Sequence, residues 1–277
     1  MRNYNIICLL LITLSFSALA QQVYNTDAIA TALSGSDACY SYSWFGTRNP
    51  ASLASLPVTS FGINYHNRYL ISGLGSQSFF VTIASKGTWG YGIHYFGTQA
   101  LNEGSFSVSY GRSIFRWLDL GIRMNGHRLS IEAFSEQSYT LSGDMGFIFK
   151  PSEDFYIGVH LVNPNRSEYF GRGYASLPSG VNAGFAYVSK QNFYLAAQLH
   201  WEDYSEIILS LGTEYWVKKS VALQTGLRVG SVISYSYGIL FDYCKYSFAL
   251  GFEQHTCLGM STAVTLTYKF STHVHQK

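Results

Sequence analysis

The chain is short of charge, of proline and of long apolar runs, and each shortage excludes a class of protein. Charged residues make up 12% of its 277 residues, against about 25% in ordinary soluble domains. Beyond residue 20, no apolar run reaches the roughly 18 residues that a transmembrane helix requires. With only five prolines, little interrupts long strands, which rarely hold proline away from their edges. The chain therefore resembles neither a typical soluble domain nor a helical membrane protein.

Cysteine and net charge exclude further classes. Four cysteines are present, of which Cys8 lies in the apolar leader. The remaining three are an odd number, so they predict no complete disulfide framework. No metal-ligand spacing occurs among them, and we expect neither a metal nor a cofactor. A net charge of +2 argues against a nucleic-acid partner.

The chain is rich instead in segments that alternate apolar and polar residues. In the segment 104–112, Phe106, Val108 and Tyr110 fall on one face and serines fall on the other. A period of two predicts a strand with one apolar and one polar face. The pattern recurs from residue 57 to residue 270 in segments of about ten residues, as in outer-membrane barrels. We therefore predict an all-β, antiparallel transmembrane barrel of about 14 strands.

The aromatic content and the turns agree with that fold. The chain has 22 tyrosines and 19 phenylalanines, which suit the aromatic girdles at the two membrane interfaces. Short polar turns such as 85–87, 150–154 and 217–220 alternate with longer loops, the longest being 163–178. Short turns face the periplasm and long loops the outside in such barrels.

The ends of the chain divide it further. Residues 1–20 combine Arg2, an apolar run and an A-x-A site, which is typical of a secretory signal peptide. Residues 21–56 do not alternate, and we expect a partly helical plug that folds into the lumen, because a barrel of this width needs water or a plug. The barrel should follow over 57–270 and a polar tail over 271–277. The expected location is the bacterial outer membrane, crossed many times.

Several polar residues fall on the predicted inner face of the strands. The candidate lumen-facing residues are Arg123, Asp144, His160, Glu214, Arg228 and Asp242. Because both signs occur and no one-sign ring is evident, two interpretations stay open. The charges either form a salt-bridged interior that stiffens the barrel or line a selective polar channel.

The longest loop is the candidate surface for a protein partner. It mixes arginines, aromatics and glycines, with Arg166, Tyr169, Phe170, Arg172 and Tyr174 as the candidate contacts. An ordinary solvated loop is the alternative. Histidines do not pair with serine or cysteine at motif spacing and no G-x-S-x-G elbow occurs, so we do not expect an enzyme.

A short motif precedes the first strand. Residues 48–54 read RNPASLA, so Asn49, Pro50, Ala51 and Leu53 form an N-P-A-x-L element. This element resembles one found before the first strand of FadL-like outer-membrane barrels. The segments 87–97, 142–147 and 158–163 with 177–178 are most similar to the PorV/PorQ branch of Bacteroidetes. The resemblance implies fourteen strands and an N-terminal plug.

Two functions follow from the resemblance. The PorV/PorQ branch implies a non-enzymatic docking or accessory component of type IX protein secretion, with other secretion or envelope proteins as partners. The alternative is a FadL-like channel for uptake of small hydrophobic molecules, and a purely structural barrel is a third possibility. A gap in the wall near the plug would favour transport, whereas an exposed apolar groove among the outer loops would favour docking. Outer-membrane lipid surrounds the barrel in every case.

Overall fold

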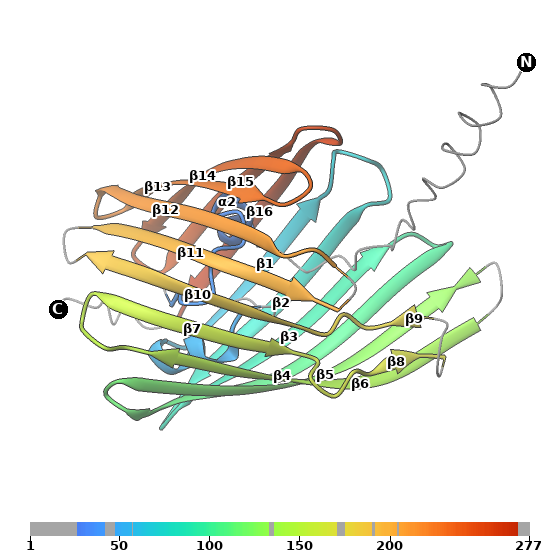
Figure 1. The fold of residues 1–277 in the computed structure, drawn as a ribbon, viewed down its shortest axis with the longest axis horizontal. Helices are drawn as coiled ribbons and strands as arrows, with labels where there is room; N and C mark the ends of the chain where they lie inside the picture. The colour runs from blue at the N-terminus through green and yellow to red at the C-terminus, as the bar shows by residue number, and fades with distance from the viewer. Residues whose placement is uncertain are drawn as a thin grey trace, which may run out of the picture.

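A computed structural model describes residues 27–41, 48–56, 58–132, 136–170, 175–189, 192–203 and 205–270. Fourteen antiparallel strands close into one barrel, as the alternation predicted (Figure 1). Neighbours in sequence are neighbours in the wall, and the first strand pairs with the last. No helix of this part of the chain is long and apolar enough to cross a membrane. The predicted signal peptide, the polar tail and the boundary at residue 57 lie outside the described residues.

The wall strands follow the chain in order. They are β1 (Ser60–Asn67), β2 (Gly75–Ala84), β3 (Thr88–Gly97), β4 (Leu101–Phe115), β5 (Leu118–Ile131), β6 (Glu136–Phe149), β7 (Phe155–Val162), β10 (Gly180–Ser189), β11 (Phe193–Glu202), β12 (Ile208–Lys218), β13 (Val221–Val229), β14 (Ile233–Tyr243), β15 (Tyr246–His255) and β16 (Gly259–Lys269). Two further strands, β8 (Glu168–Tyr169) and β9 (Ala175–Ser176), form a separate hairpin within the loop 163–178. The periodicity did not predict this hairpin.

The alternation separates an apolar outer face from a polar inner face. Phe106 of β4 is 50% exposed, whereas the adjacent Ser107 and Ser109 are 7% and 1% exposed. Aromatic rings gather where the strands meet the short turns; Phe115 stacks on Trp117 with ring centroids 5.1 Å apart. We call this the short-turn end and the opposite end the long-loop end.

Two short helices lie inside the barrel against different parts of the wall. Helix α2 (Ala28–Ala32) contacts β13, β14, β15 and β16, whereas the 3-10 helix η1 (Pro50–Ser55) contacts β3, β4, β5 and β6. Asp27 caps α2 by accepting from the backbone N–H of Ile29 at 2.8 Å, and Ala28 N donates to Thr265 Oγ1 of β16 at 3.0 Å. We call residues 27–41 and 48–56 the plug.

Glycines on the inner face make room for the plug. A β-carbon at Gly121 would overlap the Pro50 backbone, and one at Gly146 would overlap Asn49 Oδ1. The wall positions Gly158, Gly212, Gly226, Gly238 and Gly251 approach residues 28–39 in the same way. Inner-face glycines therefore mark the path of the plug along the wall.

Candidate functional site

The wall is incompletely paired between β6 and β7. Strand β6 pairs with β5 over its whole length, from Leu118↔Phe149 to Ile131↔Glu136. It pairs with β7 only from Met145↔Leu161 to Phe149↔Ile157, because β7 ends at Val162 while β6 runs on toward the long-loop end. Residues 138–144 of β6 thus have no strand partner on this side in the described chain. We call this part of the wall the seam.

The loop after β7 covers the seam, and Figure 1 shows β8 beside the extended end of β6. Gly143 N donates to Asn165 Oδ1 at 3.1 Å, and Phe170 N donates to Ser138 Oγ at 2.8 Å. The Ser167 hydroxyl donates to the carbonyl oxygen of Leu141. Each of these hydrogen bonds joins a side chain to the backbone, so the loop does not continue the backbone ladder of the sheet. We call residues 163–170 the seal segment.

The backbone of the seal segment is strained. Asn163, Arg166 and Phe170 have φ values of 44°, 50° and 55°. A backbone conformation in the left-handed region costs a residue other than glycine roughly 1–2 kcal/mol, and it costs asparagine least. Strained backbone that its surroundings hold in place is common in segments that move during function. The seal segment is therefore closed by a few side-chain bonds acting against its own backbone preference.

A buried ion pair lies at the base of the seam. Arg123 of β5 donates from Nε to Asp144 Oδ2 of β6 at 2.6 Å, and Asp144 Oδ1 accepts from Asn163 N at 2.9 Å. Arg123 Nη1 donates to the Arg48 carbonyl oxygen of the plug at 2.9 Å. His160 of β7 lies 3.2 Å from Arg123 Nη2. One network thus joins the plug, both strands of the seam and the start of the seal segment.

The other predicted lumen residues also have partners inside the barrel. Glu214 accepts from the Tyr40 hydroxyl at 2.8 Å, and Arg228 donates to the Ser34 carbonyl oxygen at 3.1 Å. Asp242 pairs with Lys269 at 2.8 Å near the short-turn end. The charges are thus bound within a cross-linked interior and mostly hold the plug.

The N-P-A element attaches the plug to the wall next to the seam. Asn49 Oδ1 accepts from Ala51 N at 3.0 Å and so caps η1, with Pro50 at the first helical position, where proline is favoured. The Asn49 amide lies within 3.3 Å of the carbonyl oxygens of Phe147 and Val159, which pair across β6 and β7. Ala51 and Leu53 are fully buried. The motif therefore anchors η1 where the two strands still pair.

Sequence reasoning did not identify the ionic centre of the plug. Arg48 Nη2 lies 2.6 Å from Asp27 Oδ1, and Arg48 Nε lies 3.3 Å from Asp37 Oδ2. Burial raises the pKa of Asp37 from 3.8 to about 6, although Arg48 opposes the shift. These three are the only charged residues between 21 and 56. The small number of charges in this segment could have predicted that they pair with one another, because charges in a buried segment need partners.

The candidate partner loop presents less surface than the sequence suggested. Arg166 is exposed and pairs with Asp203 at 3.1 Å. Tyr169 is only 3% exposed and donates from its hydroxyl to Glu103 Oε1 at 3.0 Å. The expectation that Tyr169 faces a partner is therefore wrong for this conformation, because its ring packs inward. Phe170 follows in the seal segment, and Arg172 and Tyr174 lie outside the described residues.

The chain folds into a closed, antiparallel, fourteen-stranded barrel, which is the architecture of outer-membrane barrels. Its structural neighbours are FadL-family outer-membrane barrels. The toluene transporter TodX of Pseudomonas putida matches with a TM-score of 0.60 and 11% identity, over 89% of this chain and 98% of that one. The toluene transporter TbuX of Ralstonia pickettii matches with a TM-score of 0.60 and 10% identity, over 90% of this chain and 100% of that one. A FadL homologue of Pseudomonas aeruginosa matches with a TM-score of 0.61 and 11% identity, over 89% of this chain and 98% of that one.

These matches show a shared fold. No protein-family model matches the chain, and no curated protein matches it either. The PorV/PorQ branch and an origin in Bacteroidetes therefore gain no support from the comparisons.

Proposed function

We propose that the chain is a channel for small hydrophobic molecules in the bacterial outer membrane, with the seam as a lateral exit. The interrupted pairing of β6 with β7 carries this proposal. Hydrophobic solutes partition into lipid more favourably than into water. An exit through the wall would deliver such a solute to the bilayer without passage through the periplasm.

The surroundings of the seam fit an apolar solute. Leu141 and Met145, on the outer face of β6, are 63% and 49% exposed. A solute leaving beside β6 would therefore meet apolar side chains and then lipid. Displacing the seal segment breaks side-chain bonds to Leu141, Gly143 and Ser138 and leaves the barrel ladder intact.

The similar structures support the same class of solute. Two of them are described as toluene transporters, and a variant of one as a monoaromatic hydrocarbon channel. Docking in type IX secretion was the other expectation, but none of these comparisons names a secretion component, and Tyr169 is buried. We therefore prefer transport, without a catalytic step.

A reversible covalent staple across the seam tests the proposal. A β-carbon at position 143 would lie 4.0 Å from Asn165 Oδ1, so Gly143→Cys with Asn165→Cys places two thiols at the seal. Cys39, Cys244 and Cys257 would first be replaced by serine. Uptake of labelled toluene and of labelled oleate would be measured in cells whose outer membrane lacks another hydrophobic channel.

We expect oxidation to reduce uptake to the rate of cells without the barrel and reductant to restore it. Each single cysteine variant is the matched control and should stay active under oxidation. If the disulfide does not form, a short bifunctional maleimide imposes the same closure. Uptake that continues through a stapled seam would refute the lateral exit, and no uptake by the parent barrel would refute the channel.

A further inference from the structure

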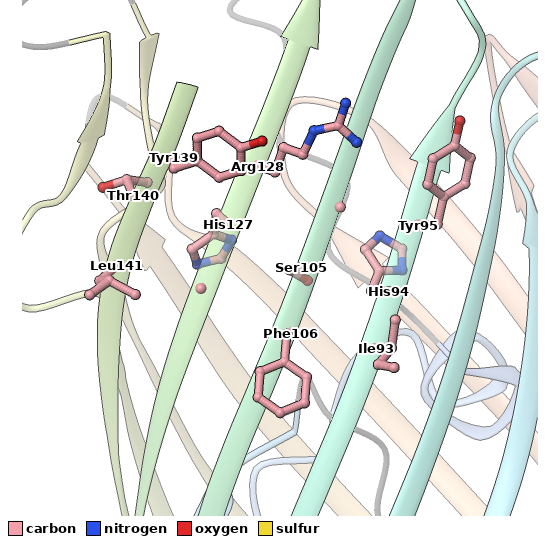
Figure 2. A pocket seen from close by; sticks show the side chains of 12 residues that line it. Ile93, His94, Tyr95, Ser105, Phe106, His127, Arg128, Tyr139, Thr140 and Leu141 are labelled. Carbon is pink, nitrogen blue, oxygen red and sulfur yellow. The ribbon is translucent and has the colours of Figure 1, made fainter. Parts of the chain in front are cut away.

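A groove lies on the outer face of the wall toward the long-loop end, away from the plug and the lumen. It crosses β3, β4, β5 and β6 and has a volume of about 500 Å³. Figure 2 shows Tyr95, Arg128 and Tyr139 in one row, with Ile93, Phe106 and Leu141 in a second row. The second row is farther from the long-loop end. The groove thus has a polar end and an apolar end.

Two glycines form the floor of the groove. Gly104 pairs with Tyr95 and with Arg128, and Gly126 pairs with Phe106 and with Leu141. A β-carbon at Gly104 would come no nearer than 3.9 Å to its surroundings, and one at Gly126 no nearer than 3.7 Å. Unlike the inner-face glycines, these two do not make room for another part of the protein. Their missing side chains leave an open channel between large apolar residues.

The polar end of the groove carries one cation. Arg128 is exposed and has no hydrogen bond or ion pair with the part of the chain that the structure describes. Its register neighbour Tyr139 is 70% exposed, and Tyr95 is 44% exposed on the other side of Gly104. Arginine on a lipid-facing surface is costly near the membrane centre and tolerated near its interface. An unpaired guanidinium there, between two tyrosines, favours an anionic headgroup.

We propose that this groove binds a phosphorylated lipid of the outer leaflet, of the acylated sugar phosphate type (lipid A). Arg128 takes the phosphate, since guanidinium and phosphate match in a bidentate geometry. Tyr139 lies beside it, and its hydroxyl would exchange its exposed bond to Gln137 Oε1, at 3.2 Å, for the phosphate. One acyl chain lies over Gly104 and Gly126, between Ile93, Phe106 and Leu141. The proposal requires the outer-membrane location but not transport, although Tyr139 and Leu141 also belong to the seam.

Native mass spectrometry of the full barrel tests the site. The barrel would be released from detergent micelles after exposure to bisphosphorylated lipid A, to its dephosphorylated form and to phosphatidylglycerol. Two variants address the two ends of the groove: Arg128→Gln removes the charge, and Gly126→Leu fills the floor. Arg112→Gln is the control, because Arg112 is an exposed arginine on β4 near the short-turn end, outside the groove.

We expect the parent barrel and Arg112→Gln to retain one bisphosphorylated lipid A with equal affinity. Arg128→Gln should weaken retention by about tenfold, since it removes hydrogen bonds to a charged group, and Arg128→Lys should recover part of it. Gly126→Leu should weaken retention of both forms of lipid A. Equal retention of phosphorylated and dephosphorylated lipid would overturn the proposal, and equal retention of phosphatidylglycerol would overturn the choice of lipid. Heat-modifiable gel mobility confirms that each variant is folded.

Discussion

The backbone N–H of Asn163 donates to the Asp144 carboxylate at 2.9 Å, so the seal segment begins on the acid that Arg123 neutralises. Because Arg123 also holds the Arg48 carbonyl oxygen, plug and seal share one buried ion pair. A change in the plug that reorients Arg123 would therefore alter the anchor of the seal segment.

Replacing Asp144 by asparagine should loosen this connection. The substitution leaves Arg123, whose side chain is 5% exposed, without its anionic partner. Breaking a buried pair in this way costs about 3–5 kcal/mol. Urea unfolding in lipid vesicles would measure the loss, and uptake of the labelled solute should rise as the seal loosens.

Asp242→Asn is the matched control for that variant. Asp242 pairs with Lys269 at 2.8 Å, but both side chains keep about a fifth of their exposure and lie near the short-turn end. Solvent contact screens an ion pair, and fully exposed pairs contribute about 0–1 kcal/mol, so we expect a smaller loss than for Asp144→Asn. Equal destabilisation by the two substitutions would contradict the special role of the seam network.

Asn49→Ala should release the plug from the wall. It removes the cap of η1 and the amide contacts with Phe147 and Val159. Cys39 is 3% exposed, and burial raises the pKa of its thiol to about 12, so it reacts slowly while the plug is docked. In a background with Cys244→Ser and Cys257→Ser, maleimide labelling of Cys39 should accelerate by about tenfold or more.

Asn102→Ala is the control for that labelling experiment. Asn102 makes one long, exposed hydrogen bond to Thr98 at the long-loop end. Its loss should leave the labelling of Cys39 unchanged. Unchanged labelling in the Asn49 variant as well would show that the N-P-A element is not the anchor.

Two glycine substitutions should differ sharply although both add the same atoms. Gly121→Val would force a β-carbon into the Pro50 backbone, and overpacking of this kind costs about 1–3 kcal/mol. The side chain added by Gly126→Val points outward, and the nearest atom to its β-carbon is 3.7 Å away. We expect faster labelling of Cys39 in the first variant alone; equal labelling would show that the plug does not follow the inner-face glycines.

The docking of the plug should depend on pH through Asp37. Its pKa is raised from 3.8 to about 6 by burial, against the attraction of Arg48, so the docked plug binds a proton more tightly than the released plug does. Docking is therefore strongest below about pH 4 and weakens as pH rises through about 6. Labelling of Cys39, corrected for the intrinsic thiol reactivity, should be slower at pH 5 than at pH 7.5.

Asp37→Asn should remove this pH dependence and dock the plug at pH 7.5 at least as well as the parent does. Arg48 keeps its contact with Asp27 at 2.6 Å in that variant, so the plug retains one ion pair. A parent plug that loosens on acidification would contradict the direction predicted here.

Alternation was enough to predict the wall but not the seam. A period of two fixes which side chains of a strand such as β4 face the lumen, and it holds throughout the barrel. It does not state how far two neighbouring strands pair, which at β6 and β7 depends on where β7 ends. The two-residue strands β8 and β9 are too short to show any period.

For the site, too, the sequence could predict which face a side chain lies on but not which residues it contacts. Arg123 and Asp144 could be placed on an inner face from sequence, because their neighbours alternate. The bonds of these two residues to Arg48 and Asn163 could not be predicted from sequence, because the bonds depend on where the plug and the loop run in space. Tyr169 lies in a segment without periodicity, and its inward orientation follows from the hairpin and from Glu103.

The contact between Ala28 and Thr265 has a consequence for assembly. Thr265 of β16 also donates to Asn64 of β1 at 2.8 Å, across the junction where the barrel closes. Helix α2 thus docks on the last strand, through a bond between residues 237 positions apart. Helix α2 can find its acceptor only once the final strand is in place, so a half-inserted barrel holds its amino-terminal segment undocked until the ring is complete.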